Sequence, residues 1–201
     1  MGGWVDGRTS IGDRMRSVKL YVMRHGPAED NAPTGRDEDR ALTPTGRERT
    51  RAVARALLAE GEAPLTIISS PLVRALQTAE IVAAVTDLEK RVREAKEPGG
   101  ASGAVEIRRE MAPGGDALGL IRELVQSGRK RAMIVGHEPD LSMLVARLVN
   151  RAPEQGMLKS MVVGVKVEPT SEDAANGRSA SSVSAALRFI LDPKSLHWQR
   201  D

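Results

Sequence analysis

Three short apolar runs, each followed closely by an arginine or a histidine, limit most strongly what this chain can fold into. The runs are Val18–Met23, Leu65–Ile68 and Ala132–Val135, and they are rich in β-branched residues. Nearly continuous apolar runs of this length are typical of parallel strands that are buried on both faces. The basic residues that follow them are Arg24, His25, Arg74 and His137. Because open α/β folds bind ligands at the carboxyl ends of their parallel strands, these four side chains are predicted to converge on one crevice.

Helical patterns separate the runs. Thr43 is predicted to cap a helix that has Pro44 at its first position and ends at Gly61. The predicted buried face of this helix consists of Gly46, Thr50, Val53, Ala54, Leu57 and Leu58. Further helices are predicted to begin at Ser70-Pro71, to span Asp116–Ser127, and to begin at Pro139.

The C-terminal part of the chain has a different pattern. Met161–Val167 and Val183–Leu191 are strand-like runs separated by a polar loop, which indicates an antiparallel hairpin. Arg93–Ala104 contains Gly and Ser and is predicted to be a flexible connection, followed by a short strand at Val105–Ile107. The alternation of strands and helices therefore predicts a three-layer α/β/α fold with a mostly parallel central sheet and a C-terminal antiparallel hairpin.

Length and composition restrict the class of protein. The 201 residues suffice for one α/β domain, predicted over 15–201, with a disordered N-terminal extension over 1–14. The chain has no cysteine, which excludes disulfides, a thiolate nucleophile and a cysteine-based zinc site, and which permits a cytoplasmic location. No apolar run approaches the roughly 20 residues that cross a bilayer, and no secretion signal precedes the first strand. We therefore expect a soluble, cytoplasmic protein without a membrane partner.

The charge pattern does not favour a nucleic-acid partner. Thirty basic residues face 27 acidic ones, and the four aromatic residues, Trp4, Tyr21, Phe189 and Trp198, are too few for a base-stacking platform. Arg47, Arg51 and Arg55 form a row on the polar side of the first predicted helix. A solvated helix face explains this row, although an acidic partner or a nucleic acid remains the alternative that a salt-dependent gel shift would reveal.

Five sequence segments resemble the histidine phosphatase superfamily, also called phosphoglycerate mutase-like, and especially its short branch of SixA-type phosphohistidine phosphatases. The segments are Met23–Gly26, Leu42–Gly46, Ser69–Ala79, Glu110–Asp116 and Val135–Ser142. They occur in the order found in that family, and the resemblance runs from about Val18 to the last strand. It implies a phosphoglycerate mutase-like fold and a phosphatase that needs no cofactor and no metal.

The resemblance also assigns roles to residues. His25 would be the nucleophile, which forms a covalent phosphohistidine that water then hydrolyses. Arg24 and Arg74 would bind the phosphate oxygens, because a guanidinium stays charged and its planar fork matches two oxygens. His137 would donate a hydrogen bond to the phosphate. Asn31 has the spacing of a phosphate-contacting asparagine in the mutases.

The general acid is the least defined part of the predicted site. Glu110 occupies the position where larger relatives carry it, Asp116 is an alternative, and Glu29 is a further loop residue within reach of the phosphate. In the SixA-like branch the acid is less clearly defined. A leaving imidazole depends less on a well-placed acid than an alkoxide does, so the site also works chemically without one.

The substrate class is inferred from a short, Gly-rich segment before Glu110, where larger relatives carry insertions that cover the site. An uncovered site admits a bulky substrate, so the sequence predicts action on phosphohistidine in a signalling or phosphotransfer protein. The alternatives are a phosphatase of small phosphomonoesters, such as sugar or nucleotide phosphates, and a non-catalytic module that binds phosphoproteins. A metallophosphatase is disfavoured because arginines beside the two histidines would repel a cation. The oligomeric state is not predicted by the sequence.

Overall fold

The computed structural model describes residues 17–95, 103–151, 153–170 and 182–200. The predicted extension over 1–14 lies outside these ranges, as do 96–102 of the predicted connection and 171–181 of the polar loop. Within them the strands form a seven-stranded sheet in the order β3-β2-β4-β1-β5-β6-β7. The strands are β1 (Val18–Arg24), β2 (Thr66–Ser69), β3 (Val105–Ile107), β4 (Arg131–Gly136), β5 (Val162–Pro169), β6 (Val183–Leu191) and β7 (Trp198–Arg200).

The parallel part of the sheet has the predicted arrangement. Strands β3, β2, β4 and β1 are parallel neighbours, whereas β5, β6 and β7 continue the sheet in antiparallel pairs. In the register, Arg24 pairs with Gly136, and Ser69 pairs with Val135. The carboxyl ends of β1, β2 and β4 therefore lie side by side to within one residue. The predicted C-terminal hairpin is confirmed, and β7 is an additional edge strand that the sequence did not indicate.

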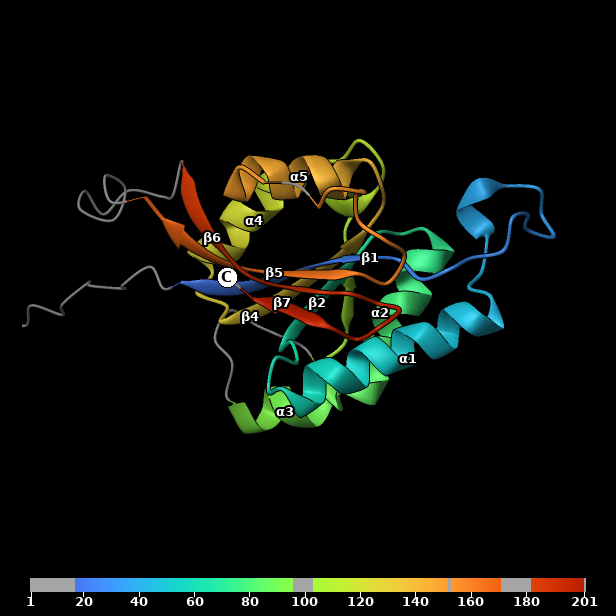
Figure 1. Cartoon of the computed structure of the whole chain (residues 1–201), viewed down its shortest axis with the longest axis horizontal. Helices are drawn as coiled ribbons and strands as arrows, with labels where there is room; N and C mark the ends of the chain where they lie inside the picture. Colours follow the sequence, from blue (N-terminus) through green and yellow to red (C-terminus); the bar gives the residue numbers. More distant parts are fainter. Residues whose placement is uncertain (1–16, 96–102, 152, 171–181, 201) are drawn as a thin grey trace, which may run out of the picture.

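Helices cover both faces of the sheet (Figure 1). The helices α1 (Pro44–Ala59), α2 (Val73–Val85) and α3 (Leu88–Ala95) lie on one face, and α4 (Ala117–Gln126) and α5 (Asp140–Val149) lie on the other. Alternate residues of β1 supply the two cores, since successive side chains of a strand point to opposite faces. Leu20 belongs to the core under α4 and α5, and Tyr21 belongs to the core under α1 and α2. The three-layer α/β/α prediction is thus confirmed.

The sequence signals for helix starts were correct for α1 and α4 but not for α2. Thr43 Oγ1 accepts a hydrogen bond from the Gly46 amide at 2.9 Å, and Asp116 caps α4 through the Gly119 amide at 2.8 Å. The predicted start of α2 at Ser70-Pro71 is wrong, because the helix begins at Val73. Ser70 instead accepts a hydrogen bond from the Leu72 amide at 3.3 Å, which forms a turn before the helix.

Two further predictions need correction. Helix α3 includes Arg93, where the sequence suggested the start of a flexible connection. Leu88 and Val92, four residues apart on α3, are buried, and this contact with the core explains why the segment is helical. Leu58 was predicted on the buried face of α1 but is 42% exposed, because this face is centred on Val53, Ala54 and Leu57.

The first turn of α1 packs directly on the chain that follows His25. A Cβ atom added to Gly46 would lie 2.0 Å from the Pro27 carbonyl oxygen, so only glycine fits there. The amide of Thr43, the cap of α1, donates to the same Pro27 carbonyl oxygen at 3.1 Å. This approach holds the segment after β1 at the carboxyl edge of the sheet.

We expect Gly46→Ala to lower the free energy of unfolding by about 1–3 kcal/mol, the usual cost of forcing extra atoms into a packed interior. Urea denaturation measures this loss. Gly35→Ala is the comparison, because a Cβ there would meet nothing within 4 Å and only the backbone strain at φ +74° would count. Equal unfolding midpoints for Gly46→Ala and the unchanged protein would contradict the close contact with Pro27.

Among the described residues, no helix combines the length and the apolar character that crossing a bilayer requires.

Candidate active site

The carboxyl edge of the parallel strands brings together the residues that the sequence singled out. Arg24 ends β1 and His25 follows it, Arg74 is in the first turn of α2, and His137 connects β4 to α5. His25, Arg74 and His137 are buried, at 7%, 5% and 4% exposure. The His25 and His137 ring centroids are 5.1 Å apart. Burial of this many cationic and titratable groups at one edge is costly unless they have a shared partner.

The His25 ring is held in one tautomer. Its Nδ1 lies 2.7 Å from the Gly26 carbonyl oxygen, which can only accept a hydrogen bond, so Nδ1 carries the proton. Nε2 is then the unprotonated nitrogen with a free lone pair. The backbone around the ring is fixed as well: the His25 amide donates to Gly136 O at 3.1 Å, and the Gly26 amide donates to Thr78 Oγ1 at 3.0 Å.

The electrostatic surroundings keep both imidazoles neutral. Burial lowers the pKa of His25 to about 3; the Gly26 hydrogen bond is the next largest effect and opposes this shift, and the charges of His137, Arg74 and Arg24 lower the pKa further. Burial also lowers the pKa of His137 to about 4, helped by Arg74 and opposed by Asp140 and Asp37. At neutral pH His25 therefore has the protonation state of a nucleophile.

Three nitrogen atoms of this cluster are buried without a hydrogen-bond partner among the described residues: Arg24 Nε, Arg74 Nε and His137 Nδ1. Buried polar atoms in folded proteins are nearly always paired, so these three atoms need a partner from solvent or from a ligand. The Nε atoms of the two arginines can only donate hydrogen bonds. An anion with several oxygens, such as phosphate, matches this set of groups.

The two arginines are anchored differently. Arg24 Nη1 donates to the Met157 carbonyl at 2.7 Å, and its own amide donates to the Met161 carbonyl at 3.2 Å. Arg74 donates from Nη1 to the Asp37 carbonyl at 2.8 Å and from Nη2 to Asp37 Oδ2 at 2.9 Å. No sequence pattern pointed to Asp37, since only the folded chain brings this residue to α2.

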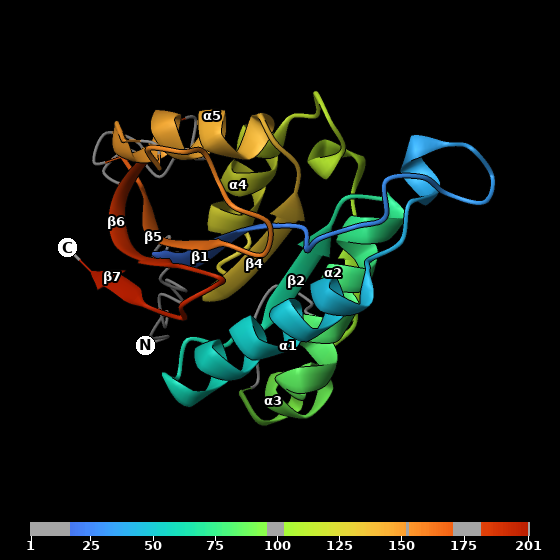
Figure 2. The ribbon, with the colours of Figure 1, turned by 45° about the vertical axis from the view of Figure 1, so that its right-hand side comes forward.

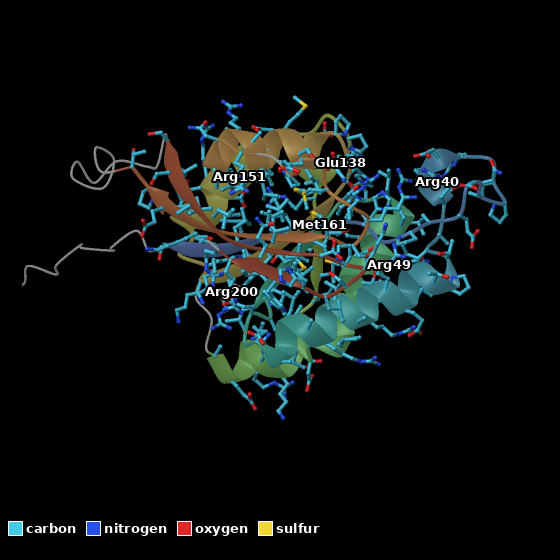
Figure 3. The ribbon with its side chains drawn as sticks, in the orientation of Figure 1. Arg40, Arg49, Glu138, Arg151, Met161 and Arg200 are labelled. Carbon is cyan, nitrogen blue, oxygen red and sulfur yellow. The ribbon has the colours of Figure 1, made fainter. Side chains whose placement is uncertain are left out.

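Asp37 lies in η1 (Asp37–Asp39), on a loop that projects beyond the carboxyl edge of the sheet (Figure 2). Arg40, labelled in Figure 3, holds the other oxygen of the Asp37 carboxylate at 2.7 Å. Asn31 and Glu29 are on the same loop, and both are exposed. The phosphate contact that the sequence suggested for Asn31 therefore stays a prediction.

Both carboxylates predicted as candidates for the general acid have other partners, and Glu110 is not arranged to hold a proton. Glu110 accepts two hydrogen bonds from Arg108, at 2.7 and 3.3 Å, and these lower the pKa of its carboxyl. A general acid near neutral pH needs a raised pKa instead. Asp116 is the cap of α4, as described above. The structure thus gives both residues structural partners.

Two further polar residues, Ser70 and Glu138, lie at the carboxyl edge of the sheet. Both belong to segments that resemble the family, but the sequence suggested no role in the active site for either. Ser70 Oγ lies 2.8 Å from His137 Nε2 and orients that ring. Glu138 follows His137 and has Oε1 buried without a partner among the described residues, and its charge favours the charged form of Arg24. For Glu138, the sequence signal was its position directly after His137. The described residues contain no group of three His, Cys, Asp or Glu side chains that would hold a metal ion.

The lowered pKa values predict how stability depends on pH. The unfolded histidines titrate near the usual value of about 6.5, so between that pH and the folded values the unfolded chain binds more protons. The histidine contribution is complete above about pH 6.5 and is lost as the pH falls toward about 4 for His137 and toward about 3 for His25. Urea denaturation across this range should show His25→Asn losing less stability on acidification than the unchanged protein. Parallel losses would contradict the lowered pKa of His25.

The fold and this edge define a class of protein: an α/β domain with a histidine-centred anion site. A family model described as histidine phosphatase superfamily (branch 1) matches residues 20–97. An uncharacterized protein of Picosynechococcus sp. strain PCC 7002 is 39% identical over 125 residues, which cover 62% of this chain and 68% of that protein. The chain belongs to the histidine phosphatase superfamily and is a phosphatase of its SixA-like branch.

Proteins whose names state an activity are also similar to the chain. Phosphohistidine phosphatase SixA of Escherichia coli K12 is 27% identical over 164 residues, covering 80% of this chain and 89% of SixA. A SixA structure with tungstate has a TM-score of 0.68 at 24% identity and covers 90% of this chain and 100% of its own. A mycobacterial glucosyl-3-phosphoglycerate phosphatase has a TM-score of 0.59 at 20% identity, covering 86% of this chain and 97% of its own. These two structural matches establish a shared fold.

Proposed function

We propose that this phosphatase hydrolyses phosphohistidine in a protein through a covalent phosphohistidine on His25. The observation that carries the proposal is a neutral, oriented His25 beside two arginines, Arg24 and Arg74, whose buried Nε donors have no partner among the described residues. A nucleophile and a binding site for a charged group thus occupy the same edge. This combination is what phosphoryl transfer to an imidazole requires.

The proposed reaction has two displacements. In the first, the Nε2 lone pair of His25 forms a bond to phosphorus while the P–N bond of the substrate breaks, and the leaving imidazole takes up a proton. In the second, water attacks the phosphorus, the His25–phosphorus bond breaks, and inorganic phosphate leaves with His25 neutral again. Arg24, Arg74 and His137 would stabilise the charge on the phosphate oxygens in both steps.

The state of the carboxylates supports phosphohistidine as the substrate. When an alkyl phosphate is cleaved, its alcohol leaves as an alkoxide and needs a proton from a well-placed acid. An imidazole is a better leaving group and depends less on such an acid. Glu110 is bound by Arg108, and Asp116 caps α4. The similarity to SixA, whose name states this activity, points the same way. A cytoplasmic location is part of the proposal, and a chain without cysteine is compatible with it.

Small phosphomonoesters are the second candidate, since the fold is shared with a glucosyl-3-phosphoglycerate phosphatase. The test is a comparison of kcat/KM for a phosphohistidine-carrying phosphotransfer protein, p-nitrophenyl phosphate and a panel of sugar and nucleotide phosphates. We expect the phosphoprotein to have the highest kcat/KM, and EDTA to leave all rates unchanged. A higher kcat/KM for a sugar phosphate would replace our proposal with the second candidate.

A further inference from the structure

A second hollow, of about 470 Å³, lies beside the candidate active site. One wall is the segment between α5 and β5, which includes Gln155 and Leu158. The other wall is the end of β6, the β6–β7 turn and β7, and includes Ile190 and His197. We call this hollow the side pocket. Its volume is within the range of about 300–1,000 Å³ that is usual for ligand sites.

The side pocket and the active site share a wall. Met161 lines the pocket, and its carbonyl accepts the Arg24 amide. Gly156 also lines the pocket, and a Cβ there would be 3.4 Å from Glu138 Oε2. Figure 3 labels Glu138 at the start of α5 and Met161 at the start of β5. Through the Met157 carbonyl the same segment holds the Arg24 guanidinium, so a molecule in the pocket lies next to the phosphate-binding groups.

The lining has the chemistry of a peptide site. Leu158, Met161 and Ile190 supply apolar surface, whereas Gln155, His197 and Gln199 are exposed and supply hydrogen-bond donors and acceptors. Among the lining residues, two carboxylates, of Glu154 and Asp192, accompany the Arg151 guanidinium, so the pocket has no excess of positive charge for a second phosphate. The lining contains no Phe, Tyr or Trp on which a base would stack.

We propose that the side pocket binds the polypeptide segment next to the phosphorylated residue of the protein substrate. The inference rests on the proposed function. Backbone amides of an extended segment would pair with the polar rim, and an apolar side chain of the segment would contact Leu158 and Ile190. This gives a role to His197, which lies outside the active site. A small phosphomonoester would occupy only the phosphate site.

The test uses Gln155→Trp, which fills the pocket from its exposed rim, and Gln126→Trp on α4 as the matched control outside the pocket. For each protein, kcat/KM is measured with a phosphohistidine-carrying phosphotransfer protein and with p-nitrophenyl phosphate. We expect Gln155→Trp to lower the ratio of kcat/KM for the phosphoprotein to kcat/KM for p-nitrophenyl phosphate about tenfold. The main cause is a higher KM for the phosphoprotein, as expected for loss of a central contact. Gln126→Trp should keep the ratio of the unchanged protein.

A second variant guards against misfolding. The double substitution His197→Ala with Gln199→Ala removes rim groups from exposed positions and should lower the same ratio to a smaller extent. An unchanged ratio in both variants, or an equal loss on both substrates, would overturn the side pocket as a docking site while the proposed function stands. Absence of turnover of phosphohistidine proteins by the unchanged chain would overturn the proposed function and this inference with it.

Discussion

His25→Ala should lower turnover of every phosphorylated substrate by at least about a thousandfold, because it removes the nitrogen that is proposed to form the covalent intermediate. The same variant should lose the phosphoenzyme. Both are measured with a substrate labelled on phosphorus, in steady state and after an alkaline quench that preserves the P–N bond. The residual rate would come from phosphate binding by the arginines alone.

The control for this prediction is Gln126→Ala, which lies on α4 away from the site and should keep both turnover and label. Circular dichroism confirms that the His25 variant is folded. Turnover at the original rate would mean that hydrolysis does not pass through His25. Label retained on another residue would mean that His25 is not the nucleophile.

Arg74→Ala should lower kcat/KM by about 10²–10³, the usual loss when a preorganised donor to a developing charge is removed. Arg74 is buried in the first turn of α2, where the amides at the helix start also attract an anion. Arg74→Lys should recover only part of the loss, because an ammonium is a point charge and cannot bind two oxygens side by side. Steady-state kinetics with p-nitrophenyl phosphate and the phosphoprotein measure both variants.

Two further variants show whether Arg74 acts by binding the phosphate or by anchoring the loop that carries Asp37. Arg93→Ala removes an exposed arginine of α3 that pairs with Glu89, and it should leave kcat/KM unchanged. Asp37→Ala breaks the ion pair to Arg74 but keeps the guanidinium. If Asp37→Ala lost as much activity as Arg74→Ala, then Arg74 would act by holding the loop and not by binding the phosphate.

Much of the fold followed from local patterns. Val18–Met23 and Ala132–Val135 were identified as strands because β-branched apolar runs fit a sheet that is buried on both faces. Helix starts were marked by Thr43, which precedes Pro44, and by Asp116. The side-chain oxygens of Thr43 and Asp116 accept hydrogen bonds from amides in the first turn that have no partner within the helix. The start of α2 was misplaced because Ser70 forms a turn of its own, which is a choice that sequence preferences do not decide.

The candidate site divides in the same way. That His25 and His137 would lie together was predictable, since parallel neighbours end at one edge and each histidine follows such a strand. The Arg74–Asp37 and Glu110–Arg108 pairs were not predictable in strength or choice of partner, because a charged side chain has many possible partners along a chain. The side pocket combines residues 151–161 with the last two strands, and no local pattern announces such a contact.

The sequence by itself determined the strands, their alternation with helices, and the placing of two histidines and two arginines at strand or helix ends. It could do so because these features depend on neighbours within a few residues of each other. Only the tertiary structure decided which His25 nitrogen is free, how far the pKa of each imidazole falls, which carboxylates are already bound, and where a second ligand fits. Those properties depend on burial and on groups distant in the chain, and they exist only once the chain is packed.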